Sequence, residues 1–210
     1  YFPGKGNKTA LIIAGVHGSE LSAVEIARSV IKKLKEGNQS YYNVVVVPAL
    51  FPDNIARALA IPAKIGNQEN IGRYTHSNAV DPNRQMPTLG TMLKGNKDHL
   101  GRVIEIENQF LLKLINELKP DRIINLHAIR NINNAGFYAD PRTDHSGCAF
   151  GFGSDSSLAI DMAKFVHRLG GNVEGNKLSS LANAKYPKDP QVVAQGCFQP
   201  RSINGSYLPN

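Results

Sequence analysis

Three short, predominantly apolar segments constrain the fold of this chain more than any other feature. They are residues 9–16 (TALIIAGV), 43–48 (NVVVVP) and 121–126 (DRIINL). Apolar runs of this length, bounded by glycine, proline or polar residues, predict strands that are buried on both faces. Apolar residues at helical spacing predict helices over residues 20–35, 100–118 and 156–169. Buried strands that alternate with amphipathic helices predict an α/β fold with a mixed, largely parallel sheet flanked by helices.

The remaining composition is that of an ordinary globular protein. The 210 residues are 41% hydrophobic and 20% charged, which excludes collagen-like, coiled-coil and disordered classes. No apolar stretch approaches the length of a membrane span, so we expect no transmembrane segment. The length suits one large domain, and we interpret residues 1–210 as a single catalytic domain.

The net charge of +7 favours anionic partners such as acidic peptides or cell-wall polymers, and solubility alone explains it equally well. The basic residues are scattered, so we expect no nucleic-acid partner.

Cys148 and Cys197 are compatible with one disulfide or with two free thiols. The chain begins with Tyr1 and shows no signal-peptide pattern, so either a leader has been removed or the sequence starts within its gene. The compartment stays open, with a preference for a secreted or periplasmic protein, and the oligomeric state is unconstrained.

Ionisable side chains directly follow two of the predicted strands. His17 and Glu20 are three residues apart in the turn after the first strand, and His127 follows the third. Sites in α/β folds form on the loops that leave the carboxyl ends of strands. If these two strands are neighbours, two imidazoles and a carboxylate converge, which is a donor set for catalytic zinc that leaves a position for water. The alternative for His17 and Glu20 alone is a capping role, and the second strand-end histidine argues against it.

Four motifs in this order resemble the zinc carboxypeptidase (M14) family. They are residues 17–20 (HGSE), 48–54 (PALFPDN), 81–87 (DPNRQMP) and 125–127 (NLH). The family has H-x-x-E, P-x-x-N-P-D-G, D-x-N-R-x-F-P and a later strand-end histidine. Residues 202–207 (SINGSY) also resemble the family segment that carries a mobile active-site tyrosine. Each motif is weak alone, but together they are specific, and the resemblance extends over nearly the whole chain.

The resemblance implies a metal site and a carboxylate site. His17, Glu20 and His127 would bind one zinc ion per chain. Asn83 and Arg84 would bind the free carboxylate of a substrate's terminal residue. Arginine suits this role because its planar guanidinium donates two parallel, charge-assisted hydrogen bonds. The alternative for Arg84 is an arginine that only fastens a loop.

Two further residues would act close to the scissile bond. Arg73 would polarise the carbonyl and stabilise its oxyanion, with Arg57 as a competitor for that role. Tyr207 would close over the bound substrate, unless it is an ordinary packed tyrosine.

The sequence also departs from the family pattern. Asn54 replaces the usual glycine, Pro82 precedes the Asn–Arg pair, and Met86 replaces the usual aromatic residue, which indicates an outlying, bacterial-type branch. The family's general base, a glutamate beyond the tyrosine segment, has no counterpart before Asn210. We therefore expect a domain that is incomplete at its C-terminus, in preference to one that binds zinc and ligand without turnover.

These observations predict a zinc metallocarboxypeptidase that hydrolyses the C-terminal amide bond of a peptide or muropeptide. Two alternatives stay open. One is a zinc-dependent deacylase of N-acyl amino acids, which would use the same ligands. The other is a catalytically silent domain that binds metal or peptide.

Overall fold

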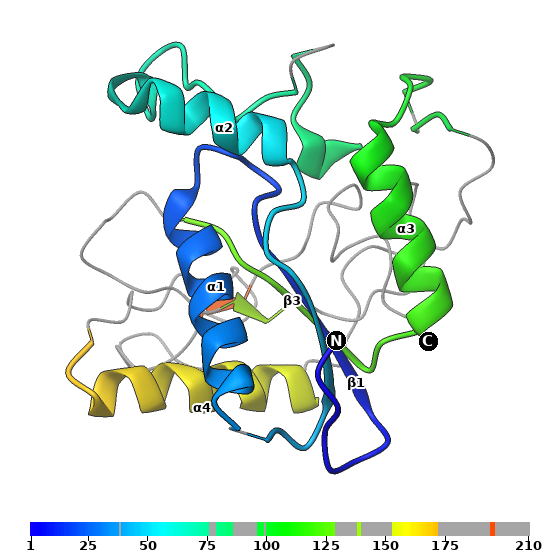
Figure 1. The fold of residues 1–210 in the computed structure, drawn as a ribbon, viewed down its shortest axis with the longest axis vertical. Helices are drawn as coiled ribbons and strands as arrows, with labels where there is room; N and C mark the ends of the chain where they lie inside the picture. Colours follow the sequence, from blue (N-terminus) through cyan, green and yellow to red (C-terminus); the bar gives the residue numbers. More distant parts are fainter. Residues whose placement is uncertain are drawn as a thin grey trace. The chain divides into compact units, whose positions relative to one another are not determined.

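The computed structural model describes residues 1–37, 39–75, 79–85, 96–98, 100–128, 138–139, 153–171 and 194–195. The chain divides into two compact units, and the first comprises Tyr1–Ala128 (Figure 1). Every described residue to which the sequence assigned a site role belongs to this first unit. The interpretation of the chain as one incomplete domain stays a prediction, as do the roles of Tyr207, Cys148 and Cys197, which lie outside the described residues.

Among the described residues of the first unit, three parallel strands form one sheet, in the order β2-β1-β3. They are β1 (Thr9–Ile13), β2 (Asn43–Val47) and β3 (Arg122–Asn125). Each lies within one of the predicted apolar segments, so the expected fold class is confirmed. Ile13, at the end of β1, is in register with Val47 on one side and with Asn125 on the other. The carboxyl ends of all three strands therefore reach the same level, and the loop after β1 lies beside the loop after β3.

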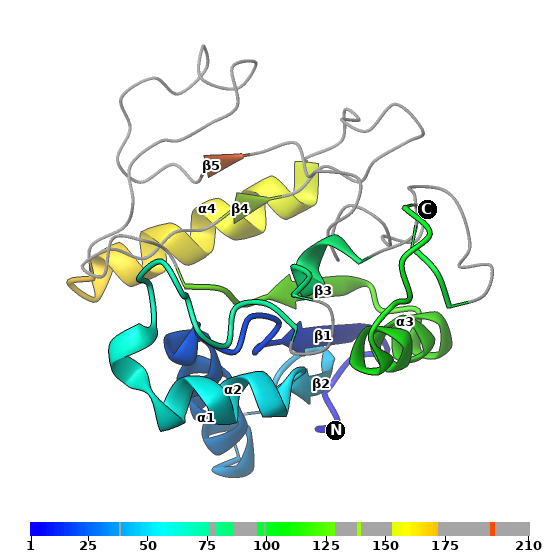
Figure 2. The ribbon, with the colours of Figure 1, turned by 90° about the horizontal axis from the view of Figure 1, so that it is seen from above.

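Helices α1 (Leu21–Lys35) and α3 (Ile106–Leu118) lie on opposite sides of the strands (Figures 1 and 2). Right-handed crossovers require this arrangement, because β2 and β3 follow on opposite sides of β1. Ala23 and Ala27 of α1 pack on Ala14 just beyond β1. The buried face of α3 carries the apolar side chains of Leu111, Leu112 and Ile115.

Shorter helical elements lie in the connection from β2 to β3. They are α2 (Pro52–Ala60) and the 3-10 helices η1 (Pro62–Lys64) and η2 (Pro82–Arg84). Helix α2 was not predicted, because residues 48–54 were interpreted only as a motif. The signals of a helix start were present, since Pro52 occupies the first turn and Asp53 adds a negative charge there.

Helix α3 begins at Ile106, six residues later than the periodicity predicts. The carboxylate of Asp98 accepts hydrogen bonds from the backbone N–H groups of Leu100 and Arg102, and Gly101 has a positive φ of 75°. A side chain that accepts hydrogen bonds from nearby backbone N–H groups competes with helix formation and favours a turn. The apolar residues of this stretch therefore enter a turn before the helix.

The second unit contains helix α4 (Gly153–Arg168) and the two-residue strands β4 (Tyr138–Ala139) and β5 (Ala194–Gln195). The strands pair in parallel. Helix α4 begins three residues before the predicted helix. No helix within the described residues combines the length and the apolar character that crossing a membrane requires.

Two glycines allow two loops and the first turn of α2 to approach one another at the carboxyl ends of the strands. The Gly18 N–H donates to the Gly72 carbonyl at 2.8 Å. A Cβ on Gly18 would lie 2.2 Å from the Asn54 carbonyl carbon, and one on Gly72 would lie 2.5 Å from the Asn54 carbonyl oxygen. Backbone atoms cannot move aside for a side chain. The glycines thus bring their neighbours in sequence, His17 and Arg73, to the same end of the sheet.

Gly72→Ala should lower the free energy of unfolding by about 3 kcal/mol, because it adds the clash with Asn54 to the strain of a positive φ. Gly66→Ala is the matched control, since Gly66 has a φ of +78° and nothing within 4 Å of its Cβ position. It should lose only about 1 kcal/mol. Urea denaturation measures both values. Equal losses in the two variants would contradict the close packing at Gly72.

Candidate metal centre

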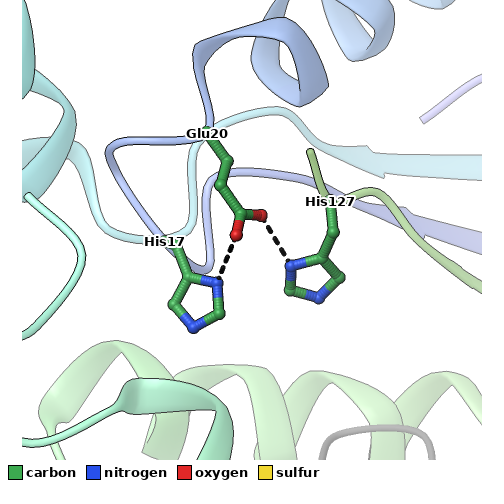
Figure 3. A group of neighbouring side chains, drawn as sticks. All are labelled: His17, Glu20 and His127. Carbon is green, nitrogen blue, oxygen red and sulfur yellow. Dashed lines mark hydrogen bonds and ion pairs between the residues drawn. The ribbon is translucent and has the colours of Figure 1, made fainter. Parts of the chain in front are cut away.

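The structure brings together the three side chains that the sequence suggests as metal ligands. His17 Nδ1 lies 2.9 Å from Glu20 Oε1, and His127 Nδ1 lies 2.7 Å from Glu20 Oε2 (Figure 3). One ligand atom from each residue lies within 4.8 Å of the others. The two histidines therefore present the same ring nitrogen to opposite oxygens of a single carboxylate.

Local backbone structure sets these three positions. His17 is buried in the loop after β1, and its carbonyl accepts from the Glu20 N–H at 3.1 Å. Glu20 is the N-cap of α1, but its side chain makes no capping bond and turns toward the histidines instead. The Leu126 N–H donates to Ile13 and so extends the pairing of β3 with β1, which places His127 next to the β1 loop.

Glu20 remains ionised although it is only 12% exposed. Burial alone would raise its pKa, but hydrogen bonds from His127 and His17 outweigh burial and hold the pKa of the carboxyl far below its usual range. The Ala128 N–H adds a further bond to Oε2 at 3.1 Å. A charged carboxylate is the form that binds a metal ion.

Asp81 is a site residue whose role the sequence analysis missed. Its Oδ1 lies 2.9 Å from His17 Nε2, on the opposite side of the ring from Glu20. Burial raises the pKa of Asp81, but the bond with His17 outweighs it, so the pKa of this carboxyl is lowered. For His17, burial lowers the pKa, and the bonds to Asp81 and Glu20 reverse the sign and raise it. The signal was available, because a histidine ligand usually donates its other nitrogen to a carboxylate.

Arg73 lies at the same site. Its Nη1 is 3.2 Å from Glu20 Oε1, and its Nη2 is 3.7 Å from Asp81 Oδ2. Arg57, the competitor for its role, instead directs Nη1 at Asn54 Oδ1 within α2, at 3.5 Å. The structure therefore places Arg73 beside the carboxylates of the site.

Asn83 and Arg84 lie on η2, directly after Asp81. Asn83 is 8% exposed, and its backbone N–H donates to Asp81 Oδ1 at 2.9 Å. Arg84 Nη1 donates to the Asn83 carbonyl at 2.9 Å. The 3-10 helix thus connects the carboxylate that contacts His17 to the two residues suggested for substrate binding.

The donor set fits a zinc ion. Two imidazole nitrogens and one carboxylate match the three protein ligands of a catalytic zinc site. His127 contributes Nδ1, which lies 2.7 Å from Glu20 Oε2. Its Nε2 atom is buried and has no hydrogen-bond partner among the described residues.

No family model and no curated protein matches the sequence. Carboxypeptidase A from Helicoverpa armigera is similar in structure, with a TM-score of 0.55 and 15% identity over 77% of this chain and 42% of that one. The chain has a carboxypeptidase-like fold.

Candidate metallopeptidases from two Shewanella species are also similar in structure. The protein from Shewanella denitrificans has a TM-score of 0.51 at 17% identity, and the one from Shewanella amazonensis has a TM-score of 0.50 at 19% identity. Each match covers 97% of this chain, but only 62% and 65% of the two proteins. This chain therefore spans less than two thirds of each similar structure. At such identities the likeness shows the fold alone.

An ion pair between Asp98 and Arg102, neither of which is a candidate metal ligand, contacts η2. The side chain of Asp98 is fully buried, and both Nε and Nη2 of Arg102 lie 2.7 Å from its Oδ2. Arg102 Nη2 also donates to the Arg84 carbonyl at 3.3 Å. Burial raises the pKa of Asp98, but the bonds from Arg102 outweigh it and lower the pKa.

Asp98→Asn should lower the free energy of unfolding at pH 7 by about 2 kcal/mol, because it removes charge-assisted bonds from a buried site. Since the pKa of Asp98 is lowered by folding, its contribution is complete above the unfolded value of about 3.9. It is lost as the pH falls through the folded value. The difference between wild type and variant, measured by denaturation, should therefore shrink below about pH 3.9. A difference that is constant with pH would contradict an ionic origin.

Glu117→Gln, in an exposed pair with Lys113, is the control and should change the free energy of unfolding by less than about 0.5 kcal/mol.

Proposed function

We propose that this chain supplies the metal and substrate sites of a zinc-dependent metallocarboxypeptidase. The observation that carries the proposal is the convergence of His17 Nδ1 and His127 Nδ1 on the two oxygens of Glu20. This group lies at the carboxyl ends of neighbouring parallel strands, in a carboxypeptidase-like fold. Two imidazoles and a buried carboxylate at such an edge support hydrolysis assisted by a metal ion.

His17, Glu20 and His127 would hold one zinc ion per chain. When bound, zinc polarises a carbonyl group and lowers the pKa of water. Glu20 is already ionised and need not lose a proton. Asp81 fixes the orientation of His17 by accepting a hydrogen bond from Nε2, which directs Nδ1 toward the metal position.

The substrate would be a peptide or muropeptide with a free C-terminal carboxylate. Asn83 and Arg84 would bind that carboxylate, because a guanidinium forms a two-pronged, charge-assisted pair with it. Arg73 lies beside Glu20, where its guanidinium would donate hydrogen bonds to the scissile carbonyl oxygen as negative charge develops there. Tyr207 would cover the bound residue. The resemblance places the proton acceptor, a glutamate, beyond the segment that carries this tyrosine.

Purified protein should contain about one zinc ion per chain after dialysis. His17→Ala should lose it, because two remaining ligands hold zinc poorly. His167→Ala is the control, since this histidine is exposed near the end of α4 and should leave the zinc content unchanged. Elemental analysis measures the content. Absence of zinc from the wild type, even after reconstitution, would overturn the metal assignment.

Arg84→Lys should raise KM for peptides with a free C-terminus by about 10- to 100-fold, because lysine cannot reproduce the two-pronged contact. Arg28→Lys, on an exposed position of α1, is the control and should leave KM unchanged. The assay compares free peptides, the same peptides with a C-terminal amide, and N-acyl amino acids.

The substrate panel also separates the candidate functions. Preference for free peptides supports the carboxypeptidase, and preference for N-acyl amino acids supports a deacylase that uses the same ligands. Binding of zinc and peptide without hydrolysis would indicate a silent binding domain. Equal cleavage of amidated peptides would contradict the role of Arg84.

A further inference from the structure

Two fully buried amide side chains lie outside the ligand set and contact η2. Asn108 is on the buried face of α3, beside the apolar Leu111 and Leu112, and Gln85 directly follows η2. Both residues are 0% exposed. A buried amide destabilises a protein unless hydrogen bonds replace those it makes with water. The contacts of these two side chains therefore indicate what they do.

The amino group of Asn108 contacts the site segment. Its Nδ2 donates to the Pro82 carbonyl at 2.8 Å and lies 3.4 Å from Gln85 Oε1. Among the described residues, its buried Oδ1 has no hydrogen-bond partner. Because an unpaired buried oxygen lowers the free energy of unfolding, stability alone does not explain an asparagine at this position. Its amino group, directed at η2, is the part of the side chain that makes contacts.

Gln85 connects the same segment to the stretch that enters α3. Its Nε2 donates to the Val103 carbonyl at 3.0 Å, and its Oε1 accepts from the Glu105 N–H at 3.3 Å. Gln85 and Asn108 therefore hold η2 from the side of α3. At the other end of the segment, Asp81 contacts His17.

Since Pro82 follows Asp81 directly, fixing the Pro82 carbonyl restricts the position of the Asp81 carboxylate. We propose that Asn108 and Gln85 are positioning residues that hold Asp81 against His17 and set the place of Asn83 and Arg84. Within the described residues, their side-chain hydrogen bonds reach the Pro82 carbonyl, the stretch that enters α3 and one another, so they act on the site through η2. The consequence for catalysis rests on the proposed function, whereas the consequence for the geometry of His17 does not.

The first test follows the His17 Nε2–H proton by NMR, because a short bond to a carboxylate shifts this signal downfield and slows its exchange. Asn108→Ala should move the signal upfield or broaden it beyond detection. Gln109→Ala is the matched control, because Gln109 is the next residue of α3 and its side chain donates to the Ile104 carbonyl at 2.7 Å, not to η2, within the described residues. It should retain the wild-type signal. This readout requires neither turnover nor metal, so a failure of the proposed function leaves it informative.

The second test is a double-mutant cycle on zinc affinity, measured by competition with a chelator. Asp81→Ala should weaken zinc binding by about 10- to 100-fold, and Asn108→Ala by roughly tenfold at most. If Asn108 acts through Asp81, the double variant should bind zinc no more weakly than Asp81→Ala alone. Additive losses would overturn the proposal.

A purely structural role would lower the melting temperature of Asn108→Ala while the His17 signal and zinc affinity stay at their wild-type values, and that result would also overturn the proposal. If Asn108→Ala does not fold, Gln85→Met provides the same comparison, because it keeps the volume of the side chain but removes both of its polar groups. With substrate, either variant should lower kcat/KM, whereas Gln109→Ala should not.

Discussion

A charged carboxylate held away from water is the constraint on which the rest of this site depends. Glu20 is 12% exposed, and an isolated buried charge would destabilise the fold severely. Two imidazoles, the Arg73 guanidinium and the Ala128 N–H all contact it. These groups come from parts of the chain that are more than fifty residues apart. The loops that carry them must therefore meet at one point for the carboxylate to remain charged.

The sheet makes this meeting possible. Parallel strands in register bring their carboxyl ends to one level, so the loops after β1 and β3 start side by side. The close contact of these segments also requires glycine at two positions, because a Cβ on Gly18 or Gly72 would clash with the backbone of Asn54. The same packing that places Arg73 at Glu20 leaves no room for a Cβ. Electrostatics and steric fit consequently select the same loop conformations.

The apolar runs predicted the three strands because an unbroken apolar run of this length is typical of strands in a parallel sheet. The expected burial is confirmed for β1, whereas β2 and β3 are mostly half-buried. The convergence of the two histidines and Glu20 was predictable for a related reason, since strand ends in a parallel sheet mark the edge where sites form. The start of α3 was not predictable from periodicity, because Asp98 captures backbone donors in a turn that apolar spacing does not reveal. The resemblance assigns the oxyanion role to Arg73, with Arg57 as a competitor. The course of the chain after α2 brings Arg73 to Glu20, while Arg57 contacts Asn54.

The hydrogen bonds that hold η2 could not be predicted from the sequence, for a different reason. Asn108 and Gln85 are 23 residues apart, and a contact between two amides leaves no periodic or compositional trace. Pro82 shows how such a contact alters the interpretation of a residue. In the sequence it is a departure from the family pattern. In the structure it is the first residue of η2, where a backbone N–H would have no partner within the helix and the restricted φ of proline suits a tight turn. Its carbonyl accepts from Asn108 of α3 and from the backbone N–H of Gln85. Because Pro82 stiffens the segment between Asp81 and Asn83, a hydrogen bond made on the side of α3 constrains the carboxylate that orients His17.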